Sequence, residues 1–319
     1  KSGGAYYMIS RSLGAEFGGS IGLVFFLAQA VSVSMYVIGF TEALVATVPG
    51  LEGSFRLAAS VVNLVVFACV YIGAGWTIRL QYGILAVLFI AVLSFAAGAL
   101  MNFDVGAFRA NLGPGYAEGQ SALTMFALFF PAATGIMAGA NLSGDLKDPA
   151  RSIPRGTLAS IGFTGLIYIT MGVLLAGSSP RAFLQTSNMI VRETAAIPVL
   201  ITAGIFAATM SSALGSMMGA PRILQALAQD GIFKRLSEFS TRDKTTNEPR
   251  RAIILTAMIA QVGVMVGTLD LIAPIITMFF MVTYGYLNFA TFRESYARNP
   301  SYRPTFRYAH WTLALAGGV

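Results

Sequence analysis

The chain has 319 residues, of which 55% are hydrophobic and only 11% are charged, whereas soluble domains carry about 25% charged residues. This composition excludes an ordinary soluble enzyme, a soluble nucleic-acid-binding protein and a disordered chain, because each of them needs more charge to stay hydrated. With one cysteine (Cys69) and one histidine (His310), an internal disulfide and a transition-metal site are not expected either.

Eight stretches without any charged residue predict eight membrane crossings, since a bilayer core is crossed by roughly 20 apolar residues of helix. A ninth apolar run begins at residue 308 and is still apolar at Val319. The start has no signal-peptide pattern, so we expect an internal piece of a longer, all-α polytopic membrane protein. In chain order the eight stretches cover residues 17–41, 57–78, 80–103, 119–144, 156–180, 194–221, 252–269 and 271–292.

The loops between these stretches alternate between two sides of the membrane, and 17 of the 21 Lys and Arg residues fall on one side. Membrane proteins carry an excess of basic residues in their cytoplasmic loops, so this side, which includes the N-terminal end of the chain, is predicted to be cytoplasmic. The net charge of +7 therefore needs no nucleic-acid partner; a lipid bilayer, with the plasma membrane as the expected location, accounts for it.

Two further features concern the ends of predicted crossings. The first stretch continues without a basic residue to residue 48 and is long enough to cross the bilayer at a tilt. The largest loop on the basic side, 222–251, begins with the apolar spacing of Pro221–Ala228, which predicts a short amphipathic helix lying at the membrane interface.

The stretch 119–144 carries a proline and a glycine at its centre. Pro131 removes a backbone donor and Gly135 allows backbone angles closed to other residues, so two half-helices joined by a non-helical link are predicted. The first half ends in free carbonyls, with the Thr134 hydroxyl beside them, which suits a cation. The second half begins with the free N–H groups of residues 135–137, which suit an anion. A pair of glycines four residues apart also fits a helix-packing motif, so a purely architectural kink stays open.

The residues from Phe129 to Thr157 resemble the sixth span and following loop of the cation–chloride cotransporters, whose pattern reads FFPxxTGIxAGANxSGDLxDPxxxIPxGT. The core PxxTGIxAGANxSGDL distinguishes these cotransporters from the amino-acid permeases of the same superfamily. The resemblance covers the whole chain, with further matching segments at Lys1–Gly14, Ala220–Asp230, Leu271–Phe280 and Tyr302–Phe306.

This resemblance implies a sodium–potassium–chloride type member of the amino acid–polyamine–organocation transporter superfamily, with its five-plus-five inverted-repeat (LeuT-like) fold. Residues 1–319 would form a single transmembrane transporter domain that contains spans three to ten and the start of span eleven. The first broken helix of that fold would lie outside this chain.

For potassium, the resemblance implies a site made of the Tyr36 hydroxyl, the Pro131 carbonyl and the Thr134 hydroxyl. From its chemistry alone, Tyr36 fits an interior tyrosine with one hydrogen bond more simply. In the family, sodium–chloride members carry histidine at this position, so the tyrosine favours potassium binding.

For sodium, the resemblance implies the Ala208 carbonyl and the hydroxyls of Ser211 and Ser212. The alternative is that these serines bond back to the carbonyl four residues earlier and let helices pack closely. Potassium–chloride members lack the serine pair, so its presence favours sodium coupling.

For chloride, the resemblance implies the N–H groups of Gly135, Ile136 and Met137 together with the Tyr284 hydroxyl, which is a hydrogen-bond donor. The alternative for Tyr284 is an aromatic side chain that only packs at a helix interface.

Together these implications describe a secondary active symporter that couples sodium and potassium to chloride by alternating access, with Na+, K+ and Cl− as transported ions and no cofactor. The chain is not expected to be an enzyme, and no catalytic residue is assigned. The expected partners are inorganic ions, the lipid bilayer and, from the family, a second copy in a homodimer. Three alternatives stay open: an amino-acid permease, a potassium–chloride cotransporter without sodium coupling, and a membrane subunit that does not transport.

Overall fold

The computed structural model describes residues 4–48, 50–141, 143, 146–243, 248–297 and 310–318, and no strand occurs in these ranges. The segment Tyr302–Phe306, which carries part of the resemblance, lies outside the described residues. The helices are α1 Gly4–Leu13, α2 Ala15–Thr47, α3 Phe55–Ile72, α4 Ala74–Met101, α5 Val105–Asn111, α6 Ala122–Phe129, α7 Ala138–Asn141, α8 Pro149–Ser178, α9 Arg181–Thr186, α10 Ile190–Thr194, α11 Pro198–Gln229, α12 Arg250–Val266, α13 Leu269–Tyr296 and α14 Trp311–Gly318, with 3-10 turns η1 Glu52–Ser54, η2 Phe130–Ala133 and η4 Lys234–Phe239.

Among the described residues, six helices are long and apolar enough to cross a membrane. Each coincides with one of the eight predicted crossings; the other two crossings are the interrupted segment α6–η2–α7 and the 17-residue helix α12. The all-α, membrane-spanning fold class is confirmed, and it agrees with the inverted-repeat transporter fold that the resemblance implies. The six spans are Ala15–Thr47, Glu52–Ile72, Arg79–Met101, Pro149–Ser178, Pro198–Gln229 and Leu269–Tyr296.

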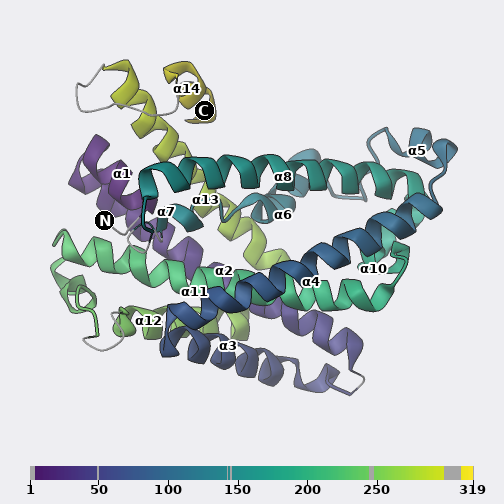
Figure 1. Cartoon of the computed structure of the whole chain (residues 1–319), viewed down its shortest axis with the longest axis horizontal. Helices are drawn as coiled ribbons and strands as arrows, with labels where there is room; N and C mark the ends of the chain where they lie inside the picture. The colour runs from purple at the N-terminus through teal and green to yellow at the C-terminus, as the bar shows by residue number, and fades with distance from the viewer. Residues whose placement is uncertain are drawn as a thin grey trace.

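The centre of the molecule is the crossing of α2 and α11, against which α3, α12 and α13 pack (Figure 1). Its apolar core includes the fully buried side chains of Phe25, Leu214 and Met217. Helices approach closely where a side chain is missing: a β-carbon on Gly263 of α12 would overlap the Ser34 side chain of α2. With 33 residues, α2 is about 50 Å long and therefore crosses a bilayer core of about 30 Å at a tilt.

A polar contact joins α3 to α12. The Asn63 amide donates to Gln261 Oε1 at 2.9 Å and to the Ala257 carbonyl at 3.3 Å. Gln261 in turn donates to Ser60 Oγ at 2.7 Å. We call these three side chains, Ser60, Asn63 and Gln261, the amide seam.

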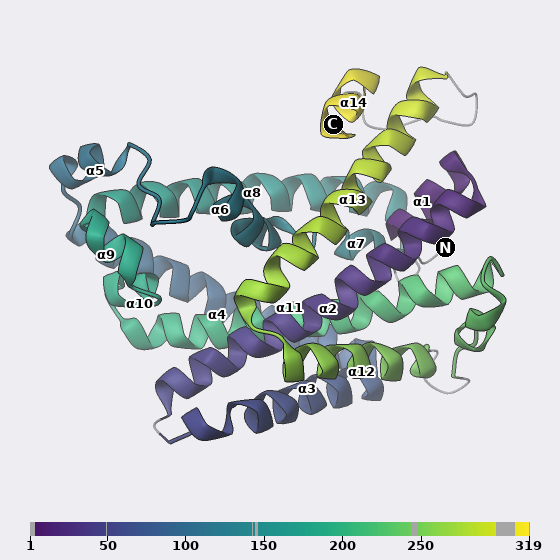
Figure 2. The ribbon, with the colours of Figure 1, turned by 180° about the vertical axis from the view of Figure 1, so that it is seen from behind.

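The interrupted segment lies on the opposite side of the molecule. Figure 2 shows α6 between α8 and α13, and α7 beside α1 and α11. The helix ends also gather at two opposite sides of the molecule, as expected for helices that cross a membrane in alternating directions. In Figure 1, α1, the start of α8 and the end of α11 lie at the left, whereas the ends of α2, α4 and α8 lie at the right.

The structure differs from the expectation for the loop 222–251. Residues 222–228 are no separate amphipathic helix at an interface; they continue α11 without a break and are buried. The following turn η4 packs against this part of α11, and the Gln225 amide donates to the Ser240 carbonyl at 3.4 Å. Arg222 also pairs with Glu248 at 3.4 Å, both side chains being buried. The apolar side chains of this segment are therefore buried inside the protein at the end of α11, and they do not lie on a membrane surface.

At the same end, α1 is fixed to α11 by a tyrosine. The Tyr6 hydroxyl donates to Asp230 Oδ2 at 2.6 Å, across 224 positions of sequence. Burial of the phenol, followed by the contact with Asp230, raises the pKa of Tyr6 well above its usual value. Tyr6 therefore stays a protonated donor at neutral pH.

Candidate functional site

The predicted interruption between α6 and α7 is confirmed. The α-helix stops at Phe129, a 3-10 turn runs over Phe130–Ala133, and Thr134 is extended with φ −80° and ψ 175°. Gly135 follows with φ +93°, a conformation that side chains with a β-carbon strongly disfavour. The proline without an N–H and the glycine with a positive φ together produce the non-helical link.

On the carbonyl side of the link, the three residues expected for potassium lie together. Thr134 donates both its backbone N–H, at 3.2 Å, and its hydroxyl, at 2.7 Å, to the Pro131 carbonyl. The Tyr36 hydroxyl, from α2, lies near the Thr134 side chain. These two hydroxyls and one carbonyl are neutral oxygen ligands, which suit a weakly hydrated cation.

On the amide side, the residues expected for chloride also lie together. None of the N–H groups of Gly135, Ile136 and Met137 donates to a backbone carbonyl of the described residues. Tyr284, from α13, lies with its hydroxyl beside the backbone of Gly135. Its ring is held by Phe130, with 6.4 Å between the ring centroids.

The Tyr284 hydroxyl is buried and makes no hydrogen bond of ordinary geometry with any described residue. A buried hydroxyl without a partner costs about 1–3 kcal/mol. Aromatic packing alone, the alternative for Tyr284, would be equally good with phenylalanine, which lacks this cost. A buried hydroxyl beside Gly135, together with three consecutive N–H groups that donate to no backbone carbonyl, is instead an arrangement that an anion would satisfy.

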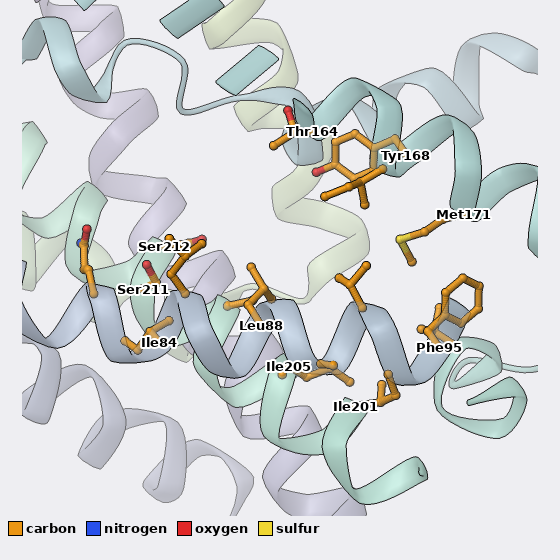
Figure 3. A pocket seen from close by; sticks show the side chains of 18 of the residues that line it. Ile84, Leu88, Phe95, Thr164, Tyr168, Met171, Ile201, Ile205, Ser211 and Ser212 are labelled. Carbon is orange, nitrogen blue, oxygen red and sulfur yellow. The ribbon is translucent and has the colours of Figure 1, made fainter. Parts of the chain in front are cut away.

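The residues expected for sodium lie elsewhere. Ala208, Ser211 and Ser212 line a cavity of about 710 Å³ between α4, α8 and α11 (Figure 3). The Tyr36, Thr134 and Tyr284 side chains are not part of its lining. The structure thus joins the potassium and chloride residues at one link and places the serine pair on a separate wall.

The serine pair does not make the hydrogen bonds that an architectural role predicts. Among the described residues, neither Ser211 nor Ser212 donates to the carbonyl four residues earlier. The neighbouring Thr209 does so, at 2.7 Å from the Ile205 carbonyl. The two serine hydroxyls are therefore free to bind a ligand in the cavity.

Sequence reasoning missed one polar residue of this region, Tyr168 of α8. Its hydroxyl donates to the Ala132 carbonyl, inside the link, at 2.8 Å. Tyr168 also lines the cavity that holds the serine pair, and Figure 3 shows its ring reaching into that cavity from the side opposite Ser211 and Ser212. The sequence feature that could have identified it is the single tyrosine in the middle of the charge-free stretch 156–180.

A second missed contact holds the first half-helix from the other side. Thr277 of α13 donates its hydroxyl to the Ala127 carbonyl of α6 at 2.7 Å. At the far side of the link, Asn141 of α7 is buried and its Oδ1 has no partner among the described residues. The first half is thus held by α13 through a hydrogen bond to its backbone, whereas the second half packs against α1 and α11.

Comparison with known proteins shows the family of the chain. Residues 1–317 match the family model described as "Amino acid permease". The chain is 36% identical over 375 aligned residues to solute carrier family 12 member 1 of Mus musculus, and 35% identical over 374 residues to solute carrier family 12 member 2 of Homo sapiens. These alignments include 100% of this chain but 34% and 31% of the two relatives, so the chain spans about a third of their length. A similar match, at 35% identity and 32% of the relative, is solute carrier family 12 member 2 of Squalus acanthias.

Proposed function

The chain belongs to the amino acid permease family, and from this premise we propose that it forms the ion-binding core of a symporter that couples sodium and potassium to chloride. The proposal rests on the full-length similarity to solute carrier family 12 members and on the chemistry of the link between α6 and α7. The cation–chloride resemblance of the sequence supplies the identity of the ions.

One observation carries the proposal. The two sides of a single broken helix present opposite donor sets: hydroxyl and carbonyl oxygens around Tyr36 and Thr134, and unpaired N–H and O–H donors around Gly135 and Tyr284. A cation and an anion bound at adjacent points stabilise each other by direct attraction. Broken helices of this kind are a common way for secondary transporters to hold ions near the middle of the membrane.

We assign potassium to Tyr36, Pro131 and Thr134, and chloride to Gly135, Ile136, Met137 and Tyr284. We assign sodium to the Ala208 carbonyl and the hydroxyls of Ser211 and Ser212. This assignment is supported by the two serine hydroxyls, which line the cavity and donate to no described residue. Downhill sodium would drive the other ions by alternating access, and one sodium with one potassium and two chlorides would make the cycle electroneutral.

The proposed location is the plasma membrane, with the N-terminal end of the chain in the cytoplasm. The separation of helix ends in Figure 1 supports a consistent alternation of crossings, and the excess of basic residues supports the direction.

The experiment uses the complete protein that contains this chain, in proteoliposomes, with rubidium as a substitute for potassium. We expect rubidium uptake that requires both external sodium and external chloride, and that falls to background when gluconate replaces chloride. Uptake that needs chloride but not sodium would contradict the sodium assignment and favour a potassium–chloride cotransporter.

A second candidate is an amino-acid permease, which the description of the matching family model favours. The N–H groups of residues 135–137 would then hold a substrate carboxylate instead of chloride. The same vesicles decide the matter: uptake of a labelled amino acid, with no rubidium uptake in any salt, would establish this candidate and overturn the cotransporter proposal.

A further inference from the structure

We infer that Tyr168 is a positioning residue that couples the serine pair to the cation side of the link, so that sodium at the serines strengthens the binding of potassium. This inference rests on the proposed function and adds to it a residue and a direction of coupling. Tyr168 is assigned no ion of its own.

The first step is the contact between Tyr168 and the link. In the turn η2, the Pro131 carbonyl accepts from Thr134, and the next carbonyl, that of Ala132, accepts from the Tyr168 hydroxyl at 2.8 Å. Adjacent peptide groups share the backbone angles of the residue between them, so fixing one carbonyl limits the rotation of its neighbour. The Tyr168 donor therefore restrains the direction in which the Pro131 carbonyl points.

The second step is the position of the phenol relative to the other groups. Its ring packs edge-on against Phe129, with 5.8 Å between ring centroids, which holds it at the end of α6. The Tyr36 and Tyr168 phenols lie close enough to interact electrostatically. The same Tyr168 side chain lines the cavity with Ala208, Ser211 and Ser212 (Figure 3).

The third step is the chemistry of the hydroxyl. Tyr168 uses its one O–H on Ala132, so the lone pairs of its oxygen remain available to the cavity. Because Tyr168 and the serines line opposite sides of the cavity, a cation at the serine pair would polarise that oxygen through the water bound to it. Polarisation of an acceptor oxygen strengthens the hydrogen bond that its own O–H donates, because hydrogen bonds in a chain reinforce one another. Sodium at the serines would in this way hold the Ala132 carbonyl more firmly and order the potassium ligands.

The structure offers a matched control for this role. Tyr82 of α4 lines the same cavity but makes no hydrogen bond to any described residue. Tyr168→Phe and Tyr82→Phe therefore remove the same atom from the same cavity, and only the first removes a contact with the link.

The test measures the half-saturation concentration of rubidium uptake in proteoliposomes of the complete protein, at low and at saturating sodium. For Tyr168→Phe we expect an increase of about three- to tenfold at saturating sodium, as for the loss of one hydrogen bond, and little change at low sodium. Tyr82→Phe should match the unmodified protein at both. A merely structural role of Tyr168 would lower the maximum rate or the melting temperature without this sodium dependence.

A double-mutant cycle gives a second measurement. The combined effect of Tyr168→Phe and Ser211→Ala on rubidium half-saturation should be smaller than the product of the two single effects, because both interrupt one connection. If Tyr168→Phe vesicles transport too weakly, the rubidium-dependent rise in melting temperature of the purified protein measures the same binding.

The outcomes separate this inference from the proposed function. Equal behaviour of Tyr168→Phe and Tyr82→Phe, or effects that multiply in the cycle, would overturn the coupling role while three-ion dependence of the unmodified protein kept the proposed function. Rubidium uptake of the unmodified protein that ignores sodium would overturn both.

Discussion

The amide seam between α3 and α12 and the cavity wall that carries the serine pair are both polar patches between apolar helices, yet their groups are used differently. In the seam, Asn63 donates to Gln261 and Gln261 donates to Ser60, so the side chains consume one another's donors. On the cavity wall, the hydroxyls of Ser211 and Ser212 have no partner among the described residues.

We interpret the difference as one between polar groups that hold helices together and polar groups that would bind an ion in the proposed function. In a membrane interior most polar side chains find a partner in the protein or face a cavity that can hold water or an ion, because lipid offers no hydrogen bonds. Polar residue types alone do not distinguish these cases. The amide N–H groups of the seam donate to other side chains, although Asn63 Oδ1 accepts from no described residue, whereas neither serine hydroxyl donates to a described residue. The link between α6 and α7 belongs with the cavity wall, since the Tyr284 hydroxyl is unpaired as well.

The strongest way to break this distinction is a change at the link itself. Gly135→Val forces a β-branched residue into a positive φ, which reorients the carbonyl and amide sides together. We expect rubidium uptake to fall to background in proteoliposomes. Gly139→Ala, at a glycine with ordinary φ and open space around it, is the matched control and should retain most of the uptake. Normal uptake by Gly135→Val would show that the link needs no special backbone.

One alanine substitution in the cavity wall and one in the amide seam are expected to have the next largest effects. Ser211→Ala removes a hydroxyl that bonds to nothing in the protein, so we expect the sodium half-saturation to rise about tenfold and the melting temperature to stay unchanged. Asn63→Ala should do the reverse, lowering the free energy of unfolding by about 1–3 kcal/mol and leaving the sodium half-saturation unchanged. Uptake assays and thermal unfolding of the two purified variants measure both. A loss of stability in Ser211→Ala without a change in sodium dependence would assign the serine to packing.

The smallest expected effect is at Tyr284. Tyr284→Phe should raise the chloride half-saturation about fivefold, because one donor to the anion is lost while three N–H groups remain. It should also leave the melting temperature equal or slightly higher, since an unsatisfied buried hydroxyl disappears. Tyr286→Phe, two residues along α13, is the control for the chloride titration. A clear fall in stability for Tyr284→Phe would reveal a structural hydrogen bond instead.

Much of the fold could be predicted because its causes are local in sequence. Charge-free stretches give the crossings, and Pro131 with Gly135 gives the interruption. The end of α11 could not be predicted in the same way. The apolar spacing of residues 222–228 fits a membrane surface as well as a buried helix end, and the choice depends on η4 folding back over it.

At the site, the family resemblance named the residues, and the structure places the potassium and chloride groups at one link and the serine pair on a separate wall, but their hydrogen-bond partners could not be read from the sequence. Tyr168 is the one tyrosine of α8, but only the rotation of that helix against α6 decides whether its hydroxyl reaches the Ala132 carbonyl. The unpaired state of Ser211 and Tyr284 is likewise a property of their surroundings and leaves no pattern in the chain.

The bond between Tyr6 and Asp230 has a consequence for how the protein is made. Its two residues are separated by 224 positions, and ribosomes add about 5–20 residues per second. At this elongation rate, the Tyr6 hydroxyl is synthesised roughly 10–45 s before the carboxylate that accepts its hydrogen bond. During that interval α1 emerges, α2 through α10 follow, and the end of α11 has yet to leave the ribosome. The hydrogen bond that joins α1 to the end of α11 can therefore form only after most of the described helices have been made.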